Sequence, residues 1–79
     1  MRHAPRLTVT EHRALGAELR RIRNELMEVH TGTVGPRYAI ASKQMRRARA
    51  AHMAVDALRD VMDKAASDEY PGKSADLYF

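Results

Sequence analysis

The chain has 79 residues, no cysteine and no tryptophan, and it carries 14 Lys and Arg against 10 Asp and Glu. A chain of this length forms at most one small domain, and the lack of cysteine excludes disulfides and thiolate metal sites. Its start has no apolar segment typical of a signal peptide, and no stretch approaches the roughly 18 apolar residues of a membrane span. We therefore expect a cytoplasmic protein with no membrane partner.

The first predicted element is a helix over about residues 10–30, preceded by a flexible basic segment, 1–9. Either Thr8 or Thr10 suits its N-cap, and Thr8 followed three residues later by Glu11 has the spacing of a capping box. Apolar residues then recur at alternating steps of four and three, which places them on one helical stripe. That stripe is Leu15, Leu19, Ile22, Leu26 and Val29.

A short turn over residues 31–35 follows this helix. Gly32 suits the left-handed conformation that ends many helices, and Pro36 suits the first turn of a new helix. Two long helices joined by so short a turn pack as antiparallel neighbours. The chain therefore reads as a helical hairpin.

The second predicted helix covers about residues 36–67 and ends before Pro71 and Gly72. Its core-facing stripe is Ala48, Ala51, Val55, Leu58 and Met62. This helix is longer than the first by about ten residues, or about 15 Å at the α-helical rise. The overhang is covered by the ends of the chain, or else residues 68–79 form a flexible end.

The second helix carries another small apolar stripe beside the first: Ala50, Ala54, Ala57 and Val61. Together the two stripes are too wide for one partner helix to cover. The predicted fold is therefore an all-α, two-helix antiparallel hairpin, coiled-coil-like, that forms a homodimer with a four-helix bundle. The alternative is that alanine is present as a good helix former and that this face is solvated.

A turn near residue 33 would pair residues whose numbers sum to about 67. That register predicts one basic belt around the middle of the hairpin, suited to nucleic-acid phosphates or an anionic partner. The belt consists of Arg20, Arg21, Arg23, Lys43, Arg46, Arg47 and Arg49. Two observations weaken it: Glu18 and Glu25 have the spacing to pair with Arg21, and no aromatic residue is interleaved for base stacking.

The same register would bring His12, His52, Asp56 and Glu11 together. No metal-ligand motif accompanies them, so chance proximity is the preferred interpretation. A two-helix chain also offers no enclosed pocket for general acid–base chemistry. We therefore expect no catalytic residue, metal site or cofactor.

These patterns predict a non-enzymatic interaction or regulatory protein that self-associates and binds another macromolecule. A protein is the favoured class of partner. The aromatic C-terminal residues Leu77, Tyr78 and Phe79 are the candidate partner motif. The alternative function is a hairpin dimer that binds nucleic-acid phosphates through the basic belt.

Overall fold

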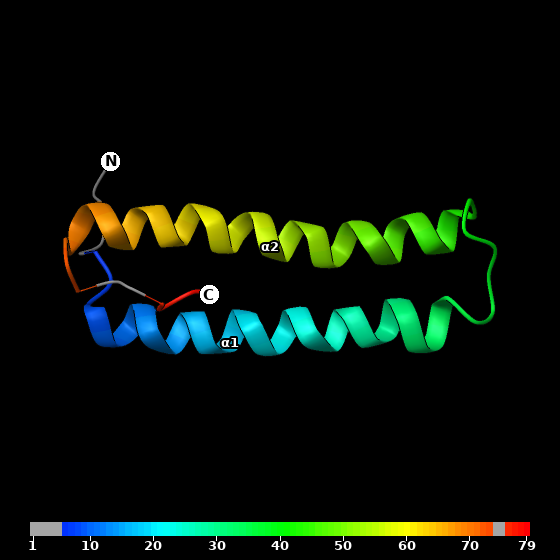
Figure 1. Ribbon diagram of the computed structural model, residues 1–79, viewed down its shortest axis with the longest axis horizontal. Helices are drawn as coiled ribbons and strands as arrows, with labels where there is room; N and C mark the ends of the chain where they lie inside the picture. The colour runs from blue at the N-terminus through cyan, green and yellow to red at the C-terminus, as the bar shows by residue number, and fades with distance from the viewer. Residues whose placement is uncertain (1–5, 74–75) are drawn as a thin grey trace.

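The computed structural model describes residues 6–73 and 76–79 as an antiparallel helical hairpin (Figure 1). Helix α1, Val9–Glu28, continues directly into a short π-helix, η1, Val29–Val34. Helix α2, Lys43–Glu69, returns alongside them, and there is no strand in this part of the chain. The predicted all-α hairpin is confirmed, whereas its dimerisation stays a prediction. No helix in the described ranges combines the length and the apolar character needed to cross a membrane.

Helix α1 begins with the capping box at Thr8. The Thr8 side chain accepts a hydrogen bond of 3.1 Å from the Glu11 backbone N–H, and the Glu11 carboxylate accepts one of 2.9 Å from the Thr8 N–H. Two first-turn donors that lack an intrahelical partner are thereby satisfied. Thr8, of the two candidates, is the cap.

The connection between the helices differs from the prediction. Gly32 lies inside η1, and Gly35 follows η1 with φ −52°, so neither glycine ends the helix in the left-handed conformation. Helix α2 begins at Lys43 and not near Pro36. The Ser42 side chain accepts a hydrogen bond of 3.2 Å from the Met45 N–H. A start at Pro36 would have followed a glycine, which has no side chain to accept such a bond.

This later start removes the predicted overhang and changes the register. The 20 residues of α1 and 6 of η1 nearly match the 27 of α2. The pairs in contact are His12 with Glu69, Arg23 with Asp56 and His30 with His52. Their numbers sum to between 79 and 82, not to about 67. Residues predicted to lie level across the hairpin are therefore several helical turns apart.

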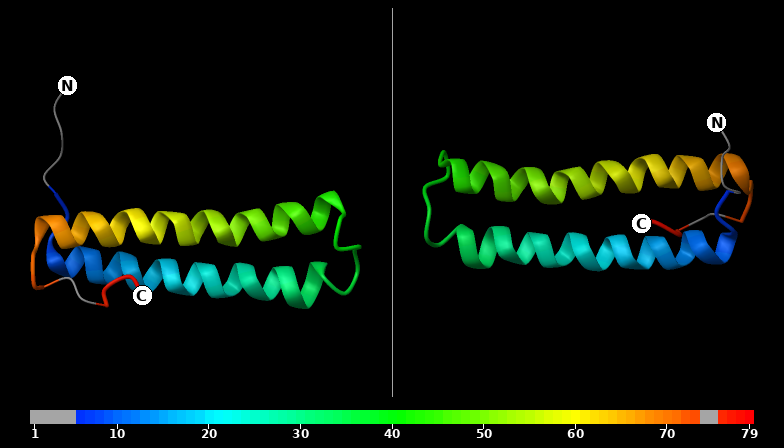
Figure 2. Two further views of the ribbon diagram at one scale, coloured as in Figure 1. Left: turned by 45° about the horizontal axis from the view of Figure 1, so that its top comes forward. Right: turned by 180° about the vertical axis from the view of Figure 1, so that it is seen from behind.

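The chain after α2 folds back on the hairpin. Gly72 has a φ of +79°, a left-handed conformation that glycine adopts without strain, and the chain reverses there. The C-terminal tail, residues 76–79, then lies along one face of the hairpin between the helices (Figures 1 and 2). Within the range predicted as a flexible end, residues 68 and 69 belong to α2, and Leu77 and Tyr78 are buried. Residues 1–5 of the predicted basic segment and residues 74–75 lie outside the described residues.

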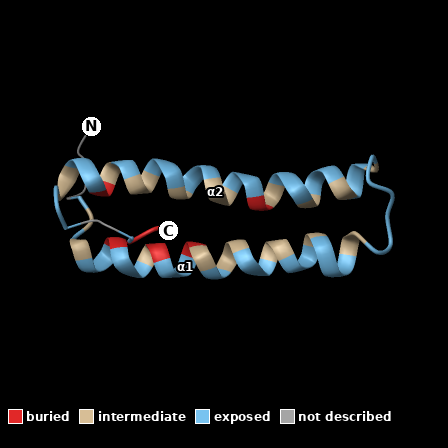
Figure 3. Ribbon diagram, viewed as in Figure 1, coloured by how far each residue is buried: buried red, intermediate tan, exposed pale blue. Residues whose placement is uncertain are grey.

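The hydrophobic core lies at the end of the hairpin that holds the termini (Figure 3). It consists of Leu19, Ala66, Leu77 and Tyr78, with Val9, Leu15, Val55 and Met62 packed against it. Of the predicted core stripes only Leu19 is fully buried, while Val29 and Leu58 are exposed. On α2 the interface positions are His52, Val55, Arg59, Met62 and Ala66, so Arg59 and not Leu58 faces α1 and the tail. Val29 is the first residue of η1, where the α-helical spacing ends.

Candidate functional site

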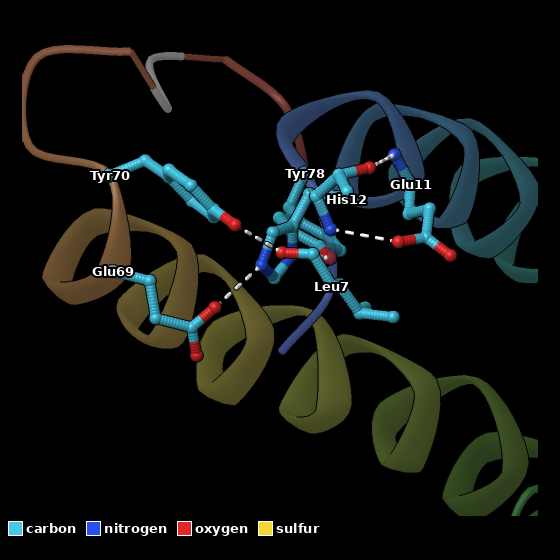
Figure 4. Close-up of polar contacts among 7 residues, drawn as sticks. Leu7, Glu11, His12, Glu69, Tyr70 and Tyr78 are labelled. Atoms are coloured by element: carbon cyan, nitrogen blue, oxygen red, sulfur yellow. Dashed lines mark hydrogen bonds and ion pairs between the residues drawn. The ribbon is translucent and has the colours of Figure 1, made fainter. Parts of the chain in front are cut away.

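A buried hydrogen-bond network joins the tail to both helices (Figure 4). His12 is 1% exposed, with Nδ1 2.6 Å from the Tyr78 hydroxyl and Nε2 3.0 Å from the Glu69 carboxylate. An ionised carboxylate only accepts hydrogen bonds, so in the neutral form of the ring the nitrogen that faces Glu69, Nε2, is the donor. Nδ1 then accepts from the Tyr78 hydroxyl. The imidazole thus connects α1, α2 and the tail.

The tail backbone is held by a glycine and two arginines. A Cβ placed on Gly16 would lie 1.8 Å from the Leu77 carbonyl oxygen, so only glycine permits this approach. Arg20 Nη1 donates to the Leu77 carbonyl and Arg59 Nε to the Tyr78 carbonyl, each at 3.0 Å. We call the set Gly16, Arg20, Arg59, His12 and Glu69 the tail-docking site.

Two aromatic contacts extend the tail-docking site. The Arg59 guanidinium lies 4.4 Å from the centre of the Phe79 ring, a cation–π geometry. The Tyr70 hydroxyl donates to the Leu7 carbonyl at 2.7 Å, and its ring meets the His12 ring edge-on. The segment before α1 and the tail after α2 are therefore fastened at the same end of the molecule.

The trio of His12, Glu69 and Tyr78 contains the residue types of acid–base catalysis, and it lies where the tail meets the two helices. The imidazole is sealed from solvent, and the hollows found in the described surface lie at the opposite end of the hairpin. Two of the three residues of the predicted partner motif, Leu77 and Tyr78, are buried against the helices in this site. Phe79 alone remains about half exposed.

The tail-docking site makes stability depend on pH in the alkaline range. Burial raises the pKa of Tyr78 above the ordinary value of 10.0, and the charges of Glu69 and Asp63 add to the effect. The unfolded chain therefore loses this proton first as the pH rises. The contribution is fully present below pH 10.0 and is lost as the pH rises through the higher folded value.

Urea unfolding measured on either side of pH 10.0 checks this expectation. The Tyr78→Phe variant lacks the ionisable hydroxyl and should lose less stability over the same interval. An equal loss in both proteins would assign the pH dependence to other groups.

The observed register separates the α1 arginines of the predicted basic belt from its α2 cations. The three α1 arginines already have partners within the chain. Arg21 forms ion pairs with Glu18 and, at 2.7 Å, with Glu25; its guanidinium holds the pKa of Glu18 below the usual value. Arg23 Nε lies 3.5 Å from the Asp56 carboxylate. Arg20 binds the tail. The three α1 arginines therefore do not join Arg46 and Arg47 in one belt.

The α2 half of the belt lies beside the connection and is unpaired in the described part of the chain. Lys43, Arg46, Arg47 and Arg49 are exposed, as is Arg37 of the connection. No ion pair forms to any of them among the described residues. We call these five residues the basic end.

The four residues predicted for self-association share an uncovered face of α2. Ala50, Ala54, Ala57 and Val61 are all exposed, and Met53 and Leu58 widen the same face. Nothing else in the described ranges covers it. We call these six residues the α2 face.

The structure does not bring His12 and His52 together, as the predicted register would have done. His12 lies in the tail-docking site, whereas the His52 ring lies against His30, with Nε2 of His52 3.1 Å from Nδ1 of His30. Within residues 6–73 and 76–79, no three His, Cys, Asp or Glu side chains group as metal ligands would.

Several functional residues were missed by the sequence patterns. Gly16 is an isolated glycine inside a helical pattern, which is a signal of a packing requirement. Arg59, Glu69 and Tyr70 carried no signal, because their roles depend on where the tail lies. The sequence pattern predicts Arg37 inside the second helix, so it does not indicate that Arg37 belongs to an exposed connection.

No family model matches this chain, and no curated protein or solved structure is significantly similar to it. Function is therefore inferred from the chain's own surfaces.

Proposed function

We propose that the protein is a non-enzymatic, cytoplasmic binding module that self-associates through the α2 face and, as a homodimer, binds another macromolecule, preferably a protein. The observation that carries this proposal is the α2 face itself. An uninterrupted apolar strip on a hairpin helix is typical of a surface that a partner covers. The best-matched partner is a second copy of the same face.

The residues of α2 favour an antiparallel, two-fold arrangement of the two copies. With the axis between residues 55 and 56, Ala50 meets Val61 of the second copy and Ala54 meets Ala57. The same alignment brings Lys43 level with Asp68, so that unlike charges flank the apolar contact. Alanine at the central positions permits close approach of the two helix backbones.

The outer face of α1 is suited to remain in solvent in such a dimer. Arg13, Glu18, Arg21 and Glu25 are exposed there, and Arg21 forms ion pairs with Glu18 and with Glu25. The four helices of the dimer would then have the two α2 helices at the central contact. The α1 faces and the two Phe79 rings would be free for the protein partner.

The substitution Ala54→Glu tests self-association. A carboxylate forced into the centre of the α2 face lacks a cationic neighbour, and the cost of about 2–3 kcal/mol corresponds to roughly a hundredfold weaker dimer. Light scattering after size exclusion should therefore report a dimer for the unaltered chain and the 8.9 kDa monomer for this variant.

The matched control is Ala14→Glu, the same substitution at an exposed position on the outer side of α1. It should leave the dimer intact, and circular dichroism should show unchanged helix content in both variants. An unaltered chain that is monomeric at every concentration tested would refute the proposal. So would equal dissociation by the two substitutions.

A further inference from the structure

The positive charge of the molecule is concentrated at the basic end. Residues 29–55 contain Arg37, Lys43, Arg46, Arg47 and Arg49 and no Asp or Glu. The remaining residues hold nine Lys and Arg against ten Asp and Glu, so the excess of four positive charges comes from this stretch. Unpaired arginines on one end of a molecule attract a polyanion.

The basic end is hollowed, not convex. Arg46 and Arg49 line a shallow hollow together with His30, and Ile40 and Met45 supply its apolar part. A neighbouring hollow contains Arg37 and Tyr38 from the connection. Single-stranded nucleic acid suits a hollow of this kind, because cations can bind its phosphates and apolar side chains can contact its bases.

Two apolar side chains of the connection are exposed beside these arginines. Ile40 is 88% exposed and Tyr38 is 47% exposed. An exposed tyrosine ring offers a platform on which a base can stack. This is the aromatic element that the predicted belt lacked.

We propose that the basic end binds single-stranded nucleic acid, with phosphates on Arg46 and Arg49 and a base stacked on Tyr38. Arg46 and Arg47 are successive residues and point about 100° apart around α2. The cations of the basic end therefore point in several directions and do not form a single line. Neither Arg49 nor Tyr38 belongs to the α2 face, so their contributions can be tested separately from self-association.

Fluorescence anisotropy with a labelled single-stranded oligonucleotide of mixed sequence, titrated over a range of salt, tests the proposal. Arg49→Glu should weaken binding by about tenfold or more and reduce the salt slope by about 0.7 or more, the value for one lost phosphate contact on a single strand. Tyr38→Ala should weaken binding by about fivefold or more and leave the salt slope unchanged.

The matched control is Arg13→Glu, which changes the net charge equally but lies on α1 at the far end of the hairpin. It should change binding by less than about twofold at physiological salt, where exposed charges more than about 8 Å away are largely screened. Equal weakening by Arg13→Glu and Arg49→Glu would overturn the proposal in favour of unspecific charge attraction.

Two further measurements separate this site from other partners and from the dimer. Vesicles of anionic lipid should not compete with the oligonucleotide; binding to vesicles alone would overturn the proposal in favour of a membrane surface. Ala54→Glu should retain oligonucleotide affinity per chain. Failure of oligonucleotide binding in a protein that still dimerises would reject this site and leave self-association standing.

Discussion

Replacement of Gly16 by alanine is expected to lower the free energy of unfolding by about 2–3 kcal/mol. The new methyl group would lie 1.8 Å from the Leu77 carbonyl oxygen, a backbone atom that cannot turn aside. The tail must therefore shift or detach, and Tyr78 and Leu77 lose their buried positions. Urea unfolding followed by circular dichroism measures the loss.

Gly32→Ala is the matched control for this substitution. A Cβ at Gly32 would meet no atom within 4 Å, and the residue lies in a helical segment. Stability should therefore stay the same or rise by up to about 1 kcal/mol, because alanine restricts the unfolded chain and favours helix. A Gly16→Ala variant as stable as Gly32→Ala would contradict the close packing of the tail.

Tyr78→Ala is expected to have the largest effect of any single substitution, about 3–5 kcal/mol. The Tyr78 side chain is fully buried in the core cluster and supplies the hydroxyl bonded to His12. Its removal leaves a cavity and an unpaired ring nitrogen. Since small domains have a total stability of about 5–15 kcal/mol, this variant should be close to unfolding at ordinary temperature.

Tyr78→Phe separates the two contributions, because it keeps the ring and removes only the hydroxyl. A loss of about 1 kcal/mol is expected, with the rest of the alanine effect due to packing. The double variant Gly16→Ala/Tyr78→Ala should lose less than the sum of the single losses, since each change undocks the same tail. Full additivity would mean that Gly16 and Tyr78 act independently.

The two ends of the hairpin differ in the burial of their side chains and in the bonding of their cations. At the end with the tail, the tail seals a core, and Arg20, Arg23 and Arg59 are bonded to carbonyls or carboxylates. At the connection the only buried side chain in the described residues is His52, and the cations are free of ion pairs. Substitutions in the tail-docking site should therefore report on stability, and substitutions in the basic end should report on binding.

Local sequence determined the elements of this protein. The spacing of Leu15, Leu19, Ile22 and Leu26 specifies an amphipathic helix, and the Thr8–Glu11 box specifies where it begins. The small residues from Ala50 to Val61 marked a face of α2 that the other described residues leave exposed. These features depend on neighbours within a turn or two, so the order of residue types is sufficient to predict them.

Only the tertiary structure decided the register and the place of the tail. Ser42 caps α2, so the connection is longer than predicted, and this shift of the helix boundary changed every pair across the hairpin. His12 and Tyr78 are 66 residues apart, so no periodicity relates them. Their contact exists because packing of the returning tail over Gly16 buries aromatic surface while the His12 ring and the Tyr78 hydroxyl keep hydrogen-bond partners. That balance depends on the whole fold.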